Sequence, residues 1–455
     1  MSNIILIACY GFIAWLFWKD MGWRKVGTRA LLIPGAWIAI QGSRPVSYWL
    51  GYGSGESNPV TTLSFALFLV AAVVVLVRRK LNWGSLVQKN KAIFLIYTYL
   101  LLSVFWSEMP FASTKRLVKD FEALLIGLIF LTEINPVEAI RAVFVRVSYI
   151  LFPLSVVFIK YFPHIGREAN KAGENMFTGV TTQKNSLGET VFVLGLFLLW
   201  DFVAIYKGEN RKGKKQQLAI RAGMLLMGLW LLVTCDSQTS MLCLVLGAVA
   251  FWGCGRLLRM RRGKAVLYAI LASIIMLAIA DKTFGLSDMV IRALGRNPTL
   301  TGRTEIWRAV LEQKTDRLVG HGFCIFWDTE KGEAVIGELM QINSTHNGFL
   351  EMYVDGGLVG VGLLIFMMLA GGRRVIDRLF AGHPLGRIGL VFWLLAILYN
   401  FSESSFFRLD VLWFTLLLLL MLTPQTRQQL AHARRLASVA PGPAFPAAQL
   451  RSSRA

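Results

Sequence analysis

Four residues of the sequence could act together on an anionic substrate: Arg167, Lys184, Arg303 and His346. Arginine matches the geometry of a phosphate group with two parallel N–H groups, and lysine supplies a compact positive charge. Histidine can accept a proton from an attacking hydroxyl near neutral pH. Arginines can also stabilise the charge that develops on a departing diphosphate. These residue types therefore predict group transfer from a lipid-linked phosphate or diphosphate.

His346 stands at the start of a predicted membrane helix, with Asn347 and Glu351 one turn apart behind it. Lys184 and Asn185 open another apolar segment in a similar way. A lone histidine is more often structural than catalytic. At the boundary between water and membrane, beside an asparagine and an intramembrane acid, a functional role is favoured.

Arg303 lies in the first turn of a predicted helix, TGRTEIWRAVLEQ. The helix presents one apolar face, formed by Ile306, Trp307, Val310 and Leu311. Arg308 has glutamates at i−3 and i+4 and is predicted to be ion-paired. Arg303 has no acid at these spacings, so we expect it to be free to bind an external anion. The alternative is a solvated loop arginine.

No motif in the sequence predicts a bound metal or a cofactor. HExxH, paired Cys/His ligands and clustered aspartates are absent, as are GxSxG, a P-loop and GxGxxG after a strand. The five cysteines have no CxxC spacing and are interpreted as packing residues in apolar segments. We therefore expect chemistry that depends on neither a metal nor a cofactor.

The composition indicates a membrane protein. The 455 residues are 55% hydrophobic and 16% charged, against about 25% charge in soluble domains, and the mean hydropathy is +0.54. This excludes an ordinary soluble enzyme and a disordered scaffold. The net charge of +21 fits basic cytoplasmic loops better than nucleic-acid binding.

Long apolar runs predict an all-α fold, a polytopic membrane bundle of about 12–13 transmembrane helices. Of the candidate spans, 29–42 and 119–132 are the weakest. The candidates are 3–18, 29–42, 59–77, 92–106, 119–132, 143–162, 187–206, 219–235, 240–257, 265–280, 347–370, 386–400 and 410–423.

The basic residues predict the orientation of the bundle. Alternate connections, beginning with 18–29 and ending with the tail, hold most Lys and Arg, so they are predicted to be cytoplasmic with the N-terminus outside. Residues 1–423 form the predicted transmembrane domain, with a long, partly helical periplasmic loop at 281–346. Residues 424–455 are rich in Ala, Pro, Arg and Ser and are predicted to be a disordered cytoplasmic tail. The first segment lacks a basic start and a cleavage site, so it is not expected to be a removable signal peptide.

In this orientation, three predicted helices begin at the same outer face, after residues 184, 236 and 346. Free N–H groups at helix starts favour anions. We therefore expect Arg167, Lys184, Arg303 and His346 to converge there.

Seven short motifs occur in an order that resembles the O-antigen ligase and polysaccharide polymerase family of bacterial inner-membrane glycosyltransferases. The resemblance spans about residues 100–425 and is closest to the exopolysaccharide-production branch, in which a KN-x-LG motif precedes a span. The motifs are WSEMPFAS (106–113), GVTTQKNSLGE (179–189), DSQTS (236–240), TGRTEIW (301–307), GHGF (320–323), HNGFLEMYVDGGLVG (346–360) and YNFSESSF (399–406).

The resemblance implies about twelve membrane helices and a metal-independent transfer of glycan from undecaprenyl diphosphate to a sugar hydroxyl on the periplasmic side. It implies that His346 is the base or orients the acceptor, and that Arg303 is the arginine of the long outer loop. Where many relatives carry an earlier arginine, this chain has Thr178, so Arg167 and Lys184 are the substitutes we expect. Flippase and copolymerase proteins are implied partners.

Two other functions remain open at this point. A transporter or flippase of lipid-linked glycan would need substrate-binding residues near the bilayer midplane and access from both sides. A structural subunit of a secretion complex would explain the hydrophobicity but not the ordered motifs. Ligases and polymerases share these motifs, so the acceptor, either a lipid core or a glycan chain, also stays open.

Overall fold

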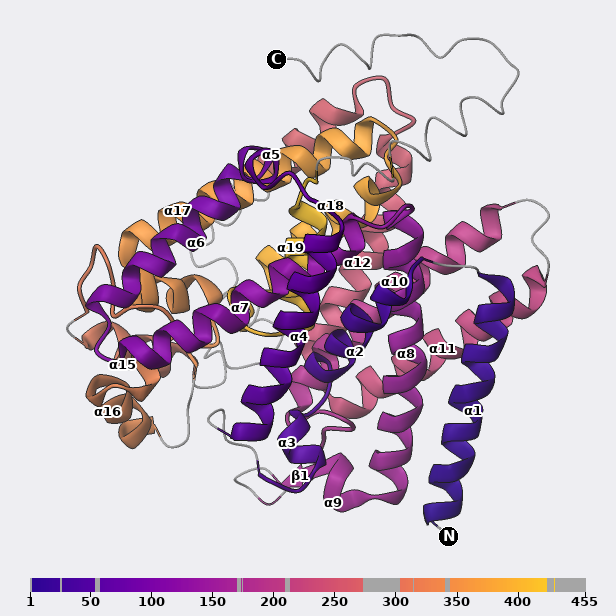
Figure 1. Cartoon of the computed structure of the whole chain (residues 1–455), viewed down its shortest axis with the longest axis horizontal. Coiled ribbons are helices and arrows are strands. Elements are labelled where there is room, and N and C mark those ends of the chain that lie inside the picture. Colours follow the sequence, from indigo (N-terminus) through magenta and orange to yellow (C-terminus); the bar gives the residue numbers. More distant parts are fainter. Residues whose placement is uncertain are drawn as a thin grey trace, which may run out of the picture.

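The structure is a computed structural model that describes residues 2–24, 27–53, 58–169, 173, 175–208, 213–272, 303–313, 315–339, 344–423 and 429. Within these ranges the only sheet is one antiparallel pair, β1 (Arg167–Ala169) and β2 (Asn175–Phe177). All other regular structure there is helical (Figure 1), so the predicted all-α class is confirmed.

The helices follow the predicted spans. Each of the thirteen predicted spans overlaps a helix, and the part of 265–280 beyond residue 272 lies outside the described residues. The helices are α1 (Ser2–Trp23), η1 (Arg29–Leu31), α2 (Leu32–Gln41), α3 (Val46–Trp49), α4 (Pro59–Arg78), α5 (Trp83–Lys89), α6 (Lys91–Ser103), η2 (Val104–Trp106), α7 (Pro110–Leu131), α8 (Pro136–Tyr161), α9 (Pro163–Gly166), α10 (Lys184–Lys207), α11 (Lys214–Cys235), α12 (Gln238–Leu257), an apolar helix Gly263–Ala272, α15 (Arg303–Glu312), η3 (Phe326–Asp328), α16 (Glu330–Leu339), α17 (Gly348–Phe380), α18 (Pro384–Tyr399) and α19 (Val411–Leu420).

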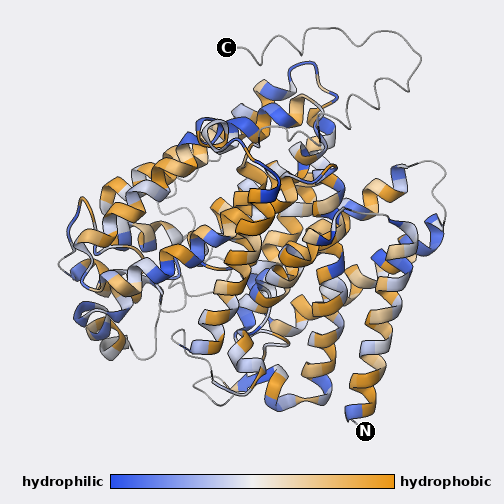
Figure 2. Cartoon of the chain, in the orientation of Figure 1, coloured by the Kyte–Doolittle hydropathy of each residue, from blue (hydrophilic) through white to orange (hydrophobic). Residues whose placement is uncertain are grey.

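Seven of the described helices are long and apolar enough to cross a membrane: α1, α4, α8, α10, α11, α12 and α17. Five further apolar helices are shorter. Figure 2 shows apolar residues along the helix bodies and hydrophilic residues mostly at their ends and in the connections. This distribution fits a bundle whose middle lies in hydrocarbon.

The centre of the bundle is formed by α8, α10 and α19. In the apolar stretches of α8 and α10, 78% and 83% of the residues are buried, against 17% in α1 and α4. All residues of α19 are buried. Helix α10 packs against α8, α11, α12 and α19, so its first residues are held in place from several sides.

Helix α17 is broken near its start at Gly357, where φ is +60°. The GHGF segment lies against this break, and the backbone N–H groups of His321 and Gly322 donate to the carbonyls of Val354 and Asp355 at 2.9 Å each. A Cβ on Gly357 would lie 2.2 Å from the carbonyl carbon of Leu318, so only glycine fits there.

Gly356 and Gly360 of α17 form a GxxxG step that serves as a packing surface. The Tyr99 ring of α6 lies 3.3 and 3.5 Å from the Cβ positions of Gly356 and Gly360, and its hydroxyl donates to the Gly356 carbonyl at 2.6 Å. Small residues let the two helices approach closely here.

The long loop contributes two helices, α15 and α16, to a second apolar cluster that includes Ile306, Val310, Phe326, Val335 and Val354. The predicted ion pair of Arg308 is confirmed with Glu312 at 2.8 Å. Leu311, predicted on the apolar face, is 58% exposed, and Ala309 is buried in its stead. Residues 281–302 and nearly all of 424–455 lie outside the described residues.

Candidate functional site

Four chain segments meet at one end of the bundle, which we call the site end. They are the starts of α10, α12 and α17 and the loop 400–410 between α18 and α19. The Thr239 hydroxyl lies 3.3 Å from that of Ser402, and the Gly348 N–H donates to the Asn400 carbonyl at 2.9 Å. The predicted meeting of the three helix starts is therefore confirmed.

Glu403 of this loop joins Arg303, His346 and Asn185. Its Oε1 accepts hydrogen bonds from Arg303 Nη2 at 2.8 Å and from Asn185 Nδ2 at 3.1 Å. Its Oε2 lies 3.0 Å from His346 Nδ1. The side chain of Glu403 is 10% exposed, whereas that of His346 is 35% exposed. The cluster thus has a buried acid and a histidine that reaches solvent.

The contact with Glu403 sets the direction in which His346 can act. An ionised carboxylate only accepts hydrogen bonds, so the proton of a neutral imidazole sits on Nδ1. Nε2 then carries the lone pair and can accept a proton from a hydroxyl. The same carboxylate holds one N–H of Arg303, which leaves other guanidinium N–H groups for an anion.

Helix α15 positions Arg303 through Trp307, one turn further along. The Trp307 indole N–H donates to the carbonyl of Thr345 at 2.8 Å, directly before His346. Residues four apart share one helix face, so fixing Trp307 also points Arg303 toward Glu403. The tryptophan at this spacing therefore helps to orient the arginine.

Glu351 and Asn347 hold the segment around His346 and do not contact Arg303. Buried Glu351 accepts from the N–H and the hydroxyl of Thr345, at 2.9 and 2.8 Å, and from Arg408. Asn347 caps α17 by accepting from the N–H groups of residues 349 and 350. Both residues therefore hold the segment that carries His346.

The backbone of His346 is itself constrained, with a φ of +49° that few residues other than glycine adopt. A Cβ on Gly348, two residues after His346, would lie 1.9 Å from Asn400 Oδ1. Only glycine therefore lets the chain lie this close to the loop 400–410. Strained backbone of this kind collects at functional sites.

Lys184 and Arg167 are placed separately from this cluster. Lys184 Nζ lies 4.0 Å from Asp236 Oδ2, so it shares the site end but pairs with the start of α12. Arg167 donates from Nε to the Ile159 carbonyl at 3.0 Å and lies 5.4 Å from the Phe177 ring centre. Within the described part of the chain, neither cation hydrogen-bonds to Glu403.

Two residues of this region were not predicted from the sequence. Glu403 lies in the YNFSESSF motif, but it is so far along the chain from Arg303 and His346 that no helix or strand spacing predicts their contact. Buried Arg44 donates to the carbonyls of Thr181, at 3.0 Å, and Ile165, and so ties the end of α2 to the segment before α10. Burial lowers the pKa of Arg44 from its ordinary value.

Arg303 is not free, contrary to the expectation from its local spacing. Its acid partner lies 100 residues away in the chain.

Among the described residues there is no group of three or more His, Cys, Asp or Glu side chains placed to hold a metal. Burial raises the pKa of the Cys324 thiol to about 12, so it is protonated at neutral pH and is a poor nucleophile.

Comparison with known proteins gives two matches. A family model described as O-antigen ligase matches residues 222–367, a range that contains both Arg303 and His346. The exopolysaccharide production protein ExoQ of Rhizobium meliloti (strain 1021) is 27% identical over 370 residues, which cover 79% of this chain and 80% of that protein. The second match extends well beyond the range of the first.

Proposed function

Since these matches identify the chain as a member of the O-antigen ligase and polysaccharide polymerase family, we propose that it transfers glycan from undecaprenyl diphosphate to a sugar hydroxyl. The chain is a multi-pass membrane protein and an enzyme of the glycosyltransferase type. Our proposal adds the donor, the periplasmic face of the bacterial inner membrane as the place of reaction, and a mechanism that needs no metal.

In the proposed reaction, the acceptor hydroxyl oxygen attacks the sugar carbon that is bonded to the diphosphate. The bond between this carbon and the phosphate oxygen breaks, and its electron pair leaves with the diphosphate. His346 Nε2 takes the hydroxyl proton, and Arg303 stabilises the negative charge on the departing group. Glu403 holds both side chains in position from the opposite side.

The observation that carries this proposal is the shared contact of Arg303 and His346 with Glu403, at 2.8 and 3.0 Å. A base and a phosphate-binding cation on one carboxylate are close enough to serve one substrate, one at the hydroxyl and the other at the leaving group. Lys184 and Arg167 are kept as further candidates for diphosphate binding, with Lys184 nearer to the cluster along α10.

The name of the matched relative supports an exopolysaccharide as the product. We propose a growing glycan chain as the acceptor. Flippase and copolymerase proteins would then supply the donor and receive the product. A lipid core as acceptor is the alternative for the same chemistry.

The test uses the purified protein in lipid nanodiscs with lipid-diphosphate-linked repeat units extracted from the producing strain. We expect His346→Ala and Arg303→Ala to lower the transfer rate by about 10²-fold or more, because proton transfer and leaving-group stabilisation each contribute on that scale. Arg308→Ala, on the exposed side of α15, and exposed His164→Ala are the matched controls and retain activity.

Full activity in either site variant would overturn the site. A knockout strain provides the second measurement, because an enzyme of this type leaves lipid-linked repeat units at the periplasmic side. Repeat units that accumulate at the cytoplasmic side would instead support a flippase. For Lys184→Gln and Arg167→Gln we expect a higher donor KM with a smaller effect on kcat.

A further inference from the structure

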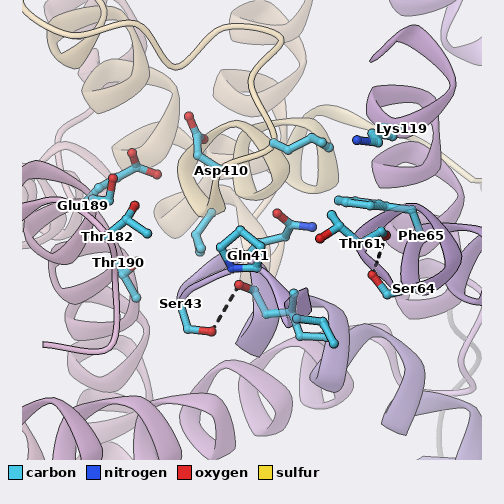
Figure 3. Close-up of a pocket in the computed structure, with 16 residues that line it drawn as sticks. Gln41, Ser43, Thr61, Ser64, Phe65, Lys119, Thr182, Glu189, Thr190 and Asp410 are labelled. Atoms are coloured by element: carbon cyan, nitrogen blue, oxygen red, sulfur yellow. Dashed lines mark hydrogen bonds between the residues drawn. The ribbon is translucent and has the colours of Figure 1, made fainter. Parts of the chain in front are cut away.

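A cavity of about 280 Å³, lined by both polar and apolar residues, lies beside the cluster and takes no part in the proposed chemistry (Figure 3). Residues from α2, α4, α7, α10 and the start of α19 surround it. We call it the side chamber, and its lining includes Gln41, Ser43, Thr61, Ser64, Phe65, Lys119, Thr182, Ser186, Glu189, Thr190 and Asp410.

The side chamber is a neighbour of the catalytic cluster through two shared segments. On α10, Asn185 contacts Glu403 and the next residue, Ser186, lines the chamber. On the loop 400–410, Glu403 belongs to the cluster and Asp410 to the chamber. The chamber and the cluster therefore share two chain segments, α10 and the loop 400–410.

Three side chains of the lining carry polar groups that the protein leaves unpaired. Gln41, Thr182 and Ser186 are half-buried and make no side-chain hydrogen bond to any described residue. In Figure 3 the Gln41 amide lies between Glu189, Thr182 and Thr190 on one side and Thr61, Ser64 and Phe65 on the other. These polar groups line the cavity and can bind the hydroxyl groups of a polyhydroxylated ligand, or water.

The charges of the side chamber select against an anion. Glu189 and Asp410 bring two carboxyl groups to the lining, and Lys119 brings one cation. A diphosphate would meet two carboxyl groups, whereas a neutral sugar would meet hydroxyls, an amide and acid oxygens, which suit its own hydroxyl groups.

We propose that the side chamber binds a sugar ring of the substrate and thereby aligns it with His346. This rests on the proposed glycan transfer. The cavity volume is close to the lower end, about 300 Å³, of small-molecule pockets and leaves room for a sugar but not for a long oligosaccharide. The ring belongs either to the donor repeat unit or to the acceptor, and the two substrates can be distinguished kinetically.

The experiment measures KM for donor and acceptor separately, each at a saturating concentration of the other. Gln41→Leu and Thr182→Val remove hydrogen-bonding groups with little change in volume. The matched controls are Gln88→Leu on α5 and Thr98→Val on α6, which are exposed and lie outside the chamber. We expect each chamber variant to raise one KM about fivefold, with kcat within about twofold, and the double variant to raise the same KM about 25-fold.

The substrate whose KM rises identifies the source of the sugar. Unchanged KM values for both substrates would overturn the side chamber as a sugar site, as would a loss of kcat alone in variants that melt like the wild type. A second readout does not depend on transfer. Equilibrium dialysis with labelled oligosaccharide, released by acid from the strain's own polymer, should show weaker binding to the double variant.

These readouts separate the two proposals. A wild-type protein that transfers no glycan, yet binds the oligosaccharide through the chamber residues, would contradict the proposed function and retain the side chamber. If the wild-type protein transfers glycan and the chamber variants change neither KM nor binding, the proposed function is retained and the side chamber is rejected as a sugar site.

Discussion

Glu403 shows how much one carboxylate can determine at the scale of the residue. It accepts from a cation, an amide and an imidazole, which come from α15, α10 and the segment before α17. Among the described residues, Glu403 is the only hydrogen-bond partner of these three side chains. Through the shared acceptor their positions become mutually dependent, so Glu403 is a positioning residue for two groups that we expect to touch the substrate.

Replacing Glu403 tests this role. Glu403→Gln removes the negative charge that holds Arg303 and orients the imidazole, so we expect kcat to fall about 10²-fold while the melting temperature changes little. Glu403→Asp should recover part of the activity, because it retains the charge on a shorter side chain. Glu330→Gln at the start of α16 is the control for the loss of a surface acid.

The sequence indicated Arg303 and His346 but could not indicate what joins them. Their acid partner is 100 and 57 residues away along the chain, and no helical or strand periodicity connects such distances. For the same reason Arg303 was expected to be free, since only i±3 and i±4 neighbours are visible in a sequence. The supports Asn347 and Glu351 were predictable because they lie within two turns of His346.

At the scale of the element, the break in α17 decides how the long loop is attached. Gly357 lets the backbone turn outward, so N–H and carbonyl groups of residues 354–359 become available to residues 317–322. The hydrophobic pattern predicted one continuous span here. A pattern of apolar residues cannot show that the helix ladder is interrupted, because the side chains on either side of the break are equally apolar.

We expect Gly357→Ala to destabilise the protein by about 2–4 kcal/mol, because alanine disfavours the positive φ and its Cβ would collide with the backbone at Leu318. Thermal unfolding in detergent measures this. Gly362→Ala, five residues further along α17 in open space, should be neutral or slightly stabilising. Equal melting temperatures for both variants would contradict the account of the break.

Helix α1 is attached to the bundle largely by buried charges. Asp20 of α1 lies 2.8 Å from both Arg146 of α8 and Arg221 of α11, and Arg221 also contacts Asp201 of α10 at 3.0 Å. Few apolar residues of α1 are buried, so this network carries much of the attachment. Composition alone could not predict it, because the partners come from four separate helices.

Arg221→Leu should therefore lower the stability by about 3 kcal/mol or more, because it removes a buried partner from two aspartates. The measurement is again the melting temperature in detergent. Lys215→Leu, at an exposed position of α11, is the control and should have little effect. A melting temperature equal to that of the wild type in Arg221→Leu would show that α1 is held by other contacts.

At the scale of the whole molecule, the hydrophobic pattern was sufficient for the fold class and for a helix in the described part of each predicted span, since burial in a bilayer requires long apolar helices. Their ends were less predictable. Helices α7 and α8 begin before the predicted spans, in segments rich in charged residues, because tertiary contacts extend a helix beyond its apolar part. Of the two helices described in the long loop, α15 and α16, the sequence showed only one amphipathic pattern.

The lack of a metal requirement stays a prediction. We expect transfer by the purified protein to remain within about twofold after treatment with EDTA, because arginine and histidine supply the charge and the base in the proposed mechanism. A loss of activity that is restored by adding a divalent cation would contradict that mechanism.

The place of Glu403 along the chain has a consequence for biosynthesis. The ribosome makes Arg303 and His346 first, and the acid that joins them follows only after α18 has been made. A nascent or prematurely terminated polypeptide therefore contains its base and its cation without their common anchor. We expect such a fragment, which also lacks α19, to transfer glycan at least about 10²-fold more slowly than the complete chain, for the same reason as Glu403→Gln.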